Sequence, residues 1–382
     1  MPRLRCRHDR DVAADLLTDR QLNRATLDRQ LLLRRHPLDP VDAVTHLVGL
    51  QAQNPLDPYL ALWSRLEDFD PVALGRRVED RTLVRIVVMR GTIHLVTADD
   101  ALVLRPLVQP VLDREIARHA EFAPHLAGVD TGPAMRFAAD VLADRPRTGT
   151  QLRAALAERF PDLHAPALAY AARCELPLVQ VPPRGVWGRS GAVTSTPLEA
   201  WVGRPPSTDG SLDDLVFRYL GAFGPATVAD AAAWSRLTGL REVFERVRPR
   251  VRTFRDERGR ELFDLPDAPR PDPDVPAPVR ILPEYDNALL SHADRSRFAA
   301  TDPTWVADAS GPFQGSVLVD GRVRGIWHAE GSTVVVEHPD LTDDEALAVA
   351  AEADRMAGVW HAAAAERGAV LRRIRRDGPA AP

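Results

Sequence analysis

The chain has 382 residues, of which 45% are apolar and 27% are charged, and its formal net charge is −5. This length exceeds one ordinary domain and fits two to four small domains with buried cores. No run approaches about 18 consecutive apolar residues, and no apolar stretch follows the charged start. We therefore expect neither a transmembrane helix nor a secretory signal, and the composition indicates a globular cytoplasmic protein.

Residue types exclude several kinds of chemistry. All 49 basic residues are arginine, so a Schiff-base lysine, a pyridoxal-phosphate anchor and a Walker-type phosphate loop are excluded. Cys6 and Cys174 stand alone, and the eleven histidines include no HExxH or CxxH spacing. We expect no disulfide framework, no metal and no cofactor.

Helix start signals dominate the first part of the chain. Asn23 is typical of an N-cap and predicts a helix that runs to about Arg35. Further starts are predicted where an N-cap aspartate precedes a proline, at Asp39-Pro40, Asp57-Pro58 and Asp70-Pro71. For Asp57, this capping role is favoured over the role of a catalytic base. Residues 83–96 are rich in β-branched side chains and predict a strand or hairpin, and 97–100 form a capping box.

Two later stretches resemble each other, at residues 146–152 and 225–231. Each opens the second helix of a predicted set of three, and a hairpin follows each set. The first hairpin is predicted at Leu178–Val181 and Val186–Arg189, and the second at Val251–Arg255 and Glu261–Leu265. Three helices followed by a two-stranded wing is the winged-helix plan, and residues 20–130 can be read the same way.

The fold class is therefore α+β, with three tandem winged-helix units and a C-terminal domain of strands and a helix. The predicted units are 20–130, 131–203 and 211–265, then a proline-rich linker at 266–279, the C-terminal domain at 280–367 and a flexible tail at 368–382. In the C-terminal domain, strands are expected at 315–319, 322–328 and 333–337, and a helix from Thr342 to about Ala365.

Gln51 and Gln53 are the leading candidates for chemistry. They lie two residues apart between an apolar helix and a proline turn, so in an extended stretch they point to the same side. Each amide offers an acceptor and two donors at every accessible pH, which suits it to hold a water or to read a base edge. The triplet alone is a weak motif, because Gln-x-Gln arises often by chance.

A second group of polar residues lies in the predicted strand. Arg90, Thr92 and His94 alternate with apolar residues and share one face. Such a face could clamp phosphates and position a base, or it could be the solvated side of a half-buried strand. In the segment 282–287, two carboxylates lie near a tyrosine, and there a structural role is favoured over a catalytic one.

Basic residues at the predicted wings suggest contacts with nucleic acid. Arg184 lies between Pro183 and Gly185 at a stiff corner, close to Arg189, and could enter a groove of DNA or simply form a solvated corner. Residues 241–260 hold eight arginines, which could contact phosphates or form a solvated face. The arginines at 372–376 allow the same two interpretations.

Several of these motifs occur together in one known family. In order, they are LVGLQAQNPLDPYLALWSRL, MRGTIHLVTADD, LPLVQVPPRGVWGRSG, LPEYDNALLSHADRSR and GSVLVDGRVRGIW. Over residues 22–361 the chain resembles the bacterial winged-helix DNA glycosylases, a family that includes the azinomycin-resistance glycosylase and its crosslink-unhooking relatives. It departs from the family in its negative net charge and at residues 298–310.

The resemblance implies a C-shaped body of three winged-helix units around duplex DNA, with Gln51 and Gln53 as the catalytic Gln-x-Gln motif. Arg90, Thr92 and His94 would shape the pocket or hold the DNA, and Pro183, Arg184, Gly185 and Arg189 would form the channel hairpin. The implied activity is hydrolysis of the N-glycosidic bond of N7-alkylguanine, including bulky or crosslinked adducts. It would serve DNA repair or self-resistance to an antibiotic. The expected partner is duplex DNA that contains alkylated bases. The protein is expected to be a monomer that binds neither a membrane nor a metal ion. The alternative is a winged-helix transcriptional regulator without catalysis.

Overall fold

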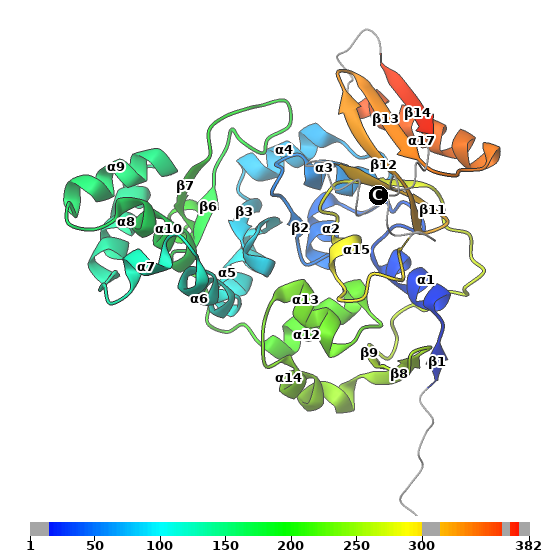
Figure 1. Cartoon of the computed structure of the whole chain (residues 1–382), viewed down its shortest axis with the longest axis horizontal. Coiled ribbons are helices and arrows are strands. Elements are labelled where there is room, and N and C mark those ends of the chain that lie inside the picture. The colour runs from blue at the N-terminus through cyan, green and yellow to red at the C-terminus, as the bar shows by residue number, and fades with distance from the viewer. Residues whose placement is uncertain (1–14, 300–313, 361–366, 374–382) are drawn as a thin grey trace, which may run out of the picture.

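A computed structural model describes residues 15–299, 314–360 and 367–373 (Figure 1). The described chain is a mixture of helices and strands, so the predicted α+β class is confirmed. In Figure 1, α7 to α10 form a lobe at the left, α12 to α14 lie at the bottom, and strands β11 to β14 lie with α17 at the upper right. Within these described ranges, no helix is both long and apolar enough to cross a membrane.

The first part of the chain surrounds the Gln-x-Gln segment. Its elements are β1 (Leu16–Leu17), α1 (Asp19–Arg29), α2 (Pro40–His46), β2 (Leu50–Gln51), α3 (Asp57–Trp63), α4 (Pro71–Glu79), β3 (Leu83–Val87), η1 (Met89–Gly91), β4 (Ile93–Thr97), α5 (Ala98–Leu107), α6 (Gln109–Arg118) and α7 (Ala123–Leu126). Asp39, Asp70 and Thr97 each accept a backbone N–H as the N-caps of α2, α4 and α5, as predicted. The predicted hairpin at 83–96 is confirmed as β3 and β4.

Two predicted caps are wrong. Thr18, not Asn23, caps α1, and Gln21 completes its capping box. Asn23 lies inside the helix, where its Nδ2 donates hydrogen bonds of 2.7 Å to the carbonyls of Arg297 and Gly321. Asp57 is the first residue of α3, and its side chain caps nothing. In both cases local propensity predicts a cap, but the side chain is buried in contact with remote parts of the chain instead.

The second part of the chain forms the left lobe of Figure 1. Its elements are α8 (Gly132–Asp144), β5 (Arg147–Thr148), α9 (Gly149–Arg159), α10 (Ala165–Glu175), β6 (Leu178–Gln180), β7 (Thr194–Pro197) and α11 (Leu198–Val202). Strand β6 pairs with β7 and not with residues 186–189, so the predicted second strand of this hairpin is wrong. Pro182, Pro183 and Gly185 interrupt the pairing, and residues 181–193 form a long connection instead.

The third part of the chain contains α12 (Leu212–Phe223), α13 (Val228–Ser235), α14 (Leu240–Val247), η2 (Arg248–Arg250), β8 (Arg252–Asp256) and β9 (Glu261–Asp264). Its predicted hairpin is confirmed, because β8 and β9 pair antiparallel. The similarity between residues 146–152 and 225–231 has a structural basis. Thr148 and Thr227 both form capping boxes, at the starts of α9 and α13.

The C-terminal part consists of β10 (Arg280–Leu282), α15 (Asn287–Leu290), β11 (Gly315–Val319), β12 (Arg322–Glu330), β13 (Thr333–His338), α17 (Asp343–Trp360) and β14 (Gly368–Arg373). The predicted strands at 315–319, 322–328 and 333–337 are confirmed. Residues 368–373 were expected to be part of a flexible tail, but β14 pairs in parallel with β13 and lies against α17. Val370 and Leu371 supply the β propensity and Leu371 packs on the local core.

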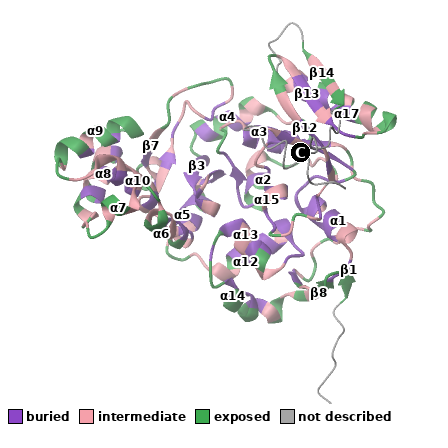
Figure 2. Cartoon of the chain, in the orientation of Figure 1, coloured by how far each residue is buried: buried purple, intermediate pink, exposed green. Residues whose placement is uncertain are grey.

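Three sheets hold these parts together. Strands of the first two parts join in one six-stranded sheet, in the order β2-β4-β3-β6-β7-β5. A five-stranded sheet runs β10-β11-β12-β13-β14, and a three-stranded sheet runs β1-β8-β9. Figure 2 shows buried residues through the middle of each part, with exposed residues on the outer helix faces. The pairing of β3 with β6 fixes the left lobe to the strands that follow Gln51.

The proline-rich segment contains no helix or strand, as predicted, but it is fixed to α1. Arg20, Arg24 and Arg29 donate hydrogen bonds of 2.8, 2.7 and 3.1 Å to carbonyls of Pro273, Val275 and Pro269, respectively. Arg29 also forms a buried ion pair with Asp264, at 2.5 Å. The segment therefore follows a fixed path across α1.

Candidate active site

The Gln-x-Gln segment begins as a strand, because β2 pairs with β4. In this register Leu50 lies opposite Leu95, and Gln51 lies opposite His94. Gly49 allows the approach, since it has φ +90° and a Cβ there would lie 2.5 Å from Val96 Cγ1. Gln51 is consequently buried at the edge of the sheet, with 6% of its surface exposed.

Arg90 connects the turn between β3 and β4 to Gln51. The turn places Arg90 in the left-handed region, at φ +59°. Its Nη2 donates a 2.6 Å hydrogen bond to Gln51 Oε1, and its Nη1 donates a 3.0 Å hydrogen bond to the carbonyl of Trp234. Burial, with the positive charges of Arg236 and Arg295 as lesser causes, lowers the pKa of Arg90 to about 10, so Arg90 is still a cation at neutral pH.

His94 is a neutral hydrogen-bond acceptor in this group. Its Nδ1 lies 3.0 Å from the carbonyl of Thr92 and must therefore carry the proton. Its Nε2 is then free to accept from Arg90 Nη2, at 3.4 Å. Burial, with Arg90 as the second cause, lowers the pKa of His94 to about 3. His94 therefore supports Arg90 and Gln51 and supplies no charge.

Gln51 and Gln53 line the same hollow, which has a volume of about 1030 Å³. Arg90 and Thr92 line it as well, so the structure brings together four of the residues predicted for the site. Gln53 is exposed in this hollow, whereas Gln51 is buried. Two amides, one fixed and one accessible to solvent, can orient a water or present carbonyl dipoles to a developing positive charge.

The hollow is strongly positive although the chain is acidic overall. Its lining includes a single carboxylate, Glu115, and six arginines: Arg90, Arg114, Arg118, Arg173, Arg236 and Arg295. These arginines come from the β3–β4 turn, α6, α10, the end of α13 and the segment after α15. Such a field concentrates anions within a Debye length of about 10 Å.

Three of these arginines have side chains without a polar partner among the described residues. Arg118, Arg236 and Arg295 are exposed, and their side chains make no hydrogen bond or ion pair within residues 15–299, 314–360 and 367–373. Arg173, in contrast, pairs with Glu115 at 3.0 Å and donates to the carbonyl of Gly91 at 3.0 Å. The hollow therefore has a fixed wall near the glutamines and unpaired cations elsewhere.

The segment 182–189 does not line this hollow. The hydroxyl of Tyr59 donates a 2.8 Å hydrogen bond to the carbonyl of Gly185, and Trp187 packs on the ring of Tyr59 with centroids 5.3 Å apart. Arg189 forms an ion pair with Glu79 on α4. Pro183, Arg184, Gly185 and Arg189 thus belong to a segment that is docked on α3 and α4.

The arginine-rich segment 241–260 is largely neutralised. Five of its eight arginines form ion pairs with acidic residues: Arg246, Arg248, Arg252, Arg258 and Arg260. Near the C-terminus, Arg372 pairs with Glu330 at 2.7 Å, and residues 374–376 lie outside the described residues. Most of the arginines in segment 241–260, and Arg372, are therefore already paired with carboxylates.

Asp57 is a buried acid rather than a cap. It is 7% exposed, and its Oδ2 has no hydrogen-bond partner in the described structure. Burial, with the nearby carboxylates of Glu284 and Asp286 as lesser causes, raises the pKa of Asp57 to about 8. Asp57 does not line the hollow, so it cannot act on a molecule bound there without a rearrangement.

The rest of segment 282–287 has the structural role that we expected. Asp286 forms a buried ion pair with Arg65 at 2.7 Å and caps α15, while Asn287 Nδ2 donates to the carbonyl of Gly49 at 2.6 Å. No group of three or more histidine, cysteine, aspartate or glutamate side chains in the described chain is arranged to hold a metal ion.

A comparison with protein families assigns the chain to one family. The family described as DNA glycosylase AlkZ-like matches residues 44–359, a range that includes both glutamines and the arginines of the hollow. The chain belongs to the AlkZ-like DNA glycosylase family. It is therefore an enzyme that acts on DNA, and a repair activity is consistent with its relatives.

Matches in Streptomyces sahachiroi support this assignment. An interstrand DNA cross-link repair glycosylase is 27% identical over 360 residues, which cover 88% of this chain and 95% of that protein. The solved structure of the DNA glycosylase AlkZ matches with a TM-score of 0.73 at 22% identity, covering 93% of this chain and 99% of that chain. This second likeness shows that the AlkZ-like chain has the same fold.

Sequence reasoning missed the arginines that line the hollow but come from segments far from the glutamines in sequence. Arg114, Arg118, Arg236 and Arg295 lie in no basic cluster of the sequence. The one local signal is that Arg236 follows α13 in the left-handed conformation, at φ 60°, where a glycine is more usual. A non-glycine residue in the left-handed conformation is a candidate for a functional role.

Proposed function

We propose that this AlkZ-like protein is a monofunctional glycosylase that hydrolyses the N-glycosidic bond of N7-alkylguanine in duplex DNA, including bulky and crosslinked adducts. The observation that carries the proposal is the meeting of Gln51 and Gln53 at one arginine-lined hollow. We further propose that the protein acts as a cytoplasmic monomer, in DNA repair or in self-resistance to an alkylating antibiotic.

In the proposed reaction, the enzyme does not need to protonate the leaving base strongly. An N7-alkylated guanine already carries a positive charge and leaves without strong protonation, so a water must be placed against an oxocarbenium-like sugar. We infer that Gln51 and Gln53 hold this water through their carbonyl oxygens. Arg90 occupies one side of Gln51 Oε1, and the remaining lone pair is available for the water.

The unpaired arginines would bind the DNA backbone. Phosphates beside the lesion would neutralise Arg118, Arg236 and Arg295, and their negative charge would offset the arginine field at the developing cationic sugar. Arg184 is half-buried on its docked segment and is proposed to contact the duplex beyond the hollow, together with Pro183 and Gly185. Arg189 would have to leave Glu79 before it could do the same.

The architecture supports such a complex. We propose that the helix sets followed by β3–β4, β6–β7 and β8–β9 are winged-helix units, arranged as a C around the duplex. Because the chain has no lysine, a lyase step through a lysine Schiff base is not available to it, and the proposed product is an abasic site.

The test is release of 7-methylguanine from methylated duplex DNA under single-turnover conditions. Gln51→Ala and Gln53→Ala should each lower the rate by about 10²–10³, the scale of lost transition-state interactions, while DNA affinity stays within a few-fold. If both variants release the base at the rate of the unmodified protein, the catalytic assignment is wrong. The alternative of a regulator without catalysis is not favoured by the family assignment, and it predicts binding without alkali-labile sites.

A further inference from the structure

Arg85 on β3 is a buried cation with few partners. It is 2% exposed, and its Nη2 donates a 2.9 Å hydrogen bond to the carbonyl of Ala52. Its Nε and Nη1 have no partner among the described residues. Burial, with the positive charge of Arg184 as a lesser cause, lowers the pKa of Arg85 to about 10, so the side chain is still charged at neutral pH. Most of the cost of burying this charge is therefore not offset by its surroundings.

The other buried arginines of the described chain have more hydrogen bonds. Arg29 and Arg65 also form ion pairs with buried aspartates. Arg85 makes one hydrogen bond, whereas two or more are made by each of Arg24, Arg29, Arg65, Arg105, Arg280 and Arg297. Stability alone does not account for Arg85, since an apolar side chain of similar length would avoid the desolvation of a charge.

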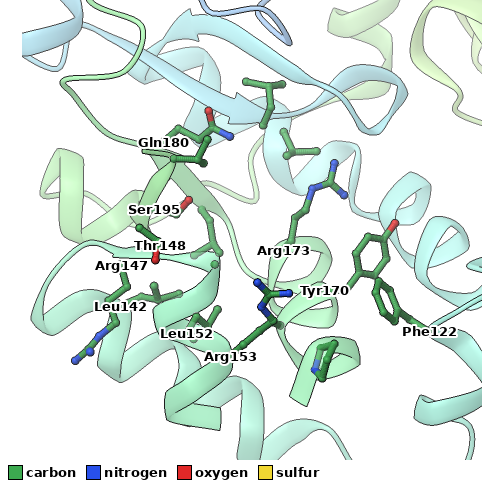
Figure 3. A pocket seen from close by; sticks show the side chains of 17 residues that line it. Phe122, Leu142, Arg147, Thr148, Leu152, Arg153, Tyr170, Arg173, Gln180 and Ser195 are labelled. Atoms are coloured by element: carbon green, nitrogen blue, oxygen red, sulfur yellow. The ribbon is translucent and has the colours of Figure 1, made fainter. Parts of the chain in front are cut away.

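The neighbouring strand does not supply the missing acceptors. Gln180 on β6 lies opposite Arg85 in the pairing of β3 with β6, but no hydrogen bond joins the two side chains. The side chain of Gln180 instead lines a cavity of about 320 Å³ between the six-stranded sheet, α9 and α10, as Figure 3 shows. Arg85 is not among the residues that line this cavity. Its one hydrogen-bond acceptor in the described structure is therefore the carbonyl of Ala52.

Gly185 holds the Arg85 side chain in place through close packing. A Cβ at Gly185 would lie 2.7 Å from Arg85 Cδ and 3.2 Å from its Nε and Nη1, so a glycine is required for this approach. Gly185 is itself fixed, because the hydroxyl of Tyr59 donates to its carbonyl at 2.8 Å. The guanidinium therefore has little freedom to move away from Ala52.

Ala52 is held through both of its backbone polar groups. Its N–H donates to the carbonyl of Ile93 at 2.8 Å, and its carbonyl accepts from Arg85. Gln53 follows directly and makes no hydrogen bond of its own within residues 15–299, 314–360 and 367–373. Because a peptide unit is planar, the bond that holds the carbonyl of Ala52 also fixes the Cα of Gln53.

We propose that Arg85 is a positioning residue for the reaction, which orients the Ala52–Gln53 peptide and thereby places Gln53 in the hollow with Gln51. The inference rests on the proposed glycosylase function, and it assigns Arg85 no contact with the DNA or with the reacting atoms. Removal of the charge should therefore slow the chemical step without loss of stability or of DNA binding.

The test replaces Arg85 by a side chain of similar length without a donor. In Arg85→Met, single-turnover release of 7-methylguanine should fall at least about 10-fold, the loss of roughly one oriented hydrogen bond, while affinity for the methylated duplex changes less than about 2-fold. The melting temperature should stay equal or rise, because a buried charge with two unpartnered N–H groups is removed.

Arg280→Met is the matched control. Arg280 is 5% exposed, it donates to the carbonyls of Leu32 and Val279, and it does not line the hollow. Burial likewise lowers the pKa of Arg280 to about 10. This variant should release 7-methylguanine at a rate within about 2-fold of the unmodified protein.

The hydrogen bond to Ala52 can be followed in the free protein by NMR. Ala52–Gln53 is the only Ala-Gln pair in the sequence, so ¹³C at the alanine carbonyls and ¹⁵N in glutamine give a single signal for this peptide. Loss of the donor in Arg85→Met should move the carbonyl carbon of Ala52 upfield, because a carbonyl that accepts a hydrogen bond is more polarised. Arg280→Met should leave this signal in place.

Three outcomes would contradict these expectations. A melting temperature that falls together with the rate in Arg85→Met would show a structural role and overturn the inference. Release by Arg85→Met at the rate of the unmodified protein would overturn it as well, whether or not the Ala52 signal moves. Absence of base release from the unmodified protein would overturn the proposed function and with it the role of Arg85, whereas the first two outcomes overturn the role of Arg85 alone.

Discussion

Arg90 Nη2 donates a 2.6 Å hydrogen bond to Gln51 Oε1, while the other nitrogen of the same guanidinium donates to the carbonyl of Trp234. One buried cation thus connects the edge of the six-stranded sheet to the end of α13. The contact fixes which way the Gln51 amide faces, because its carbonyl must point to Arg90 and its NH₂ must point away. Gln53 has no such partner in the part of the chain that the structure describes, and it is exposed in the hollow.

Replacing Arg90 should therefore affect catalysis more than binding. Arg90→Met releases the Gln51 amide, and we expect single-turnover release of 7-methylguanine to fall about 10-fold, the loss of roughly one oriented hydrogen bond. DNA affinity should fall by less than about 5-fold. Arg114→Met is the matched control, since Arg114 lines the hollow but donates to the carbonyl of Arg236. A control variant that slows the chemical step as much as Arg90→Met would contradict a positioning role.

The unpaired arginines should determine the salt dependence of binding. Arg118→Ala, Arg236→Ala and Arg295→Ala should each weaken DNA binding and reduce the slope of log K against log salt by about 1. Arg248→Ala should leave the slope unchanged, because Arg248 pairs with Glu245 and Glu261. The measurement is fluorescence anisotropy with duplex DNA from 50 to about 200 mM salt. Unchanged slopes in all three variants would place the DNA elsewhere.

Asp57 should lower stability as pH rises. Its pKa is about 8 in the folded state and about 3.9 in the unfolded state, so between these values the folded state binds more protons. The free energy of unfolding contributed by this group is then highest below pH 4 and is lost up to pH 8. Asp57→Asn should raise the free energy of unfolding at pH 8 by about 1–3 kcal/mol and change it little at pH 4. Urea denaturation at both pH values checks this, and a variant less stable at pH 8 would refute it.

His94 should not appear in the pH profile of the reaction. Its pKa is about 3, so between pH 5 and 8 the imidazole stays neutral, and the rate of base release should not depend on its titration. The unmodified protein and His94→Gln, which keeps an acceptor, should give profiles of the same shape. An inflection near pH 6.5 that disappears in His94→Gln would show that the imidazole is charged during the reaction.

Local signals in the sequence predicted most helix starts and the hairpins that have tight turns. Asp39, Asp70 and Thr97 act as caps because their neighbours on the chain supply the donors. Asn23 and Asp57 were predicted wrongly because their partners or surroundings are remote: Arg297 and Gly321 for the first, Glu284 for the second. Propensity contains no information about such contacts.

The same distinction applies to the site. Gln51 and Gln53 are neighbours in sequence, as are Arg90 and Thr92, and the pairing of β2 with β4 brings the two pairs together. The predicted strand face of Arg90, Thr92 and His94 is wrong, because Arg90 lies in the turn η1 and Thr92 precedes β4. The arginines of the hollow come from α6, α10, the end of α13 and the segment after α15, so only the tertiary fold assembles them. The docked position of Arg184 was likewise unpredictable, because it depends on Tyr59 and Trp187 from distant segments.

Strand β1, at Leu16–Leu17, pairs in parallel with β8, more than two hundred residues later in the chain. Helix α1 follows at once, and its Arg29 holds Asp264 at the end of β9. Strand β1 and helix α1 thus hold in place the part of the chain, α12 to β9, that contains Arg236. During synthesis, β1 and Arg29 gain their partners only after residue 264 has left the ribosome, so the wall of the hollow that includes Arg236 is completed late. The pairing of β2 with β4, which positions Gln51, requires no residue beyond β4.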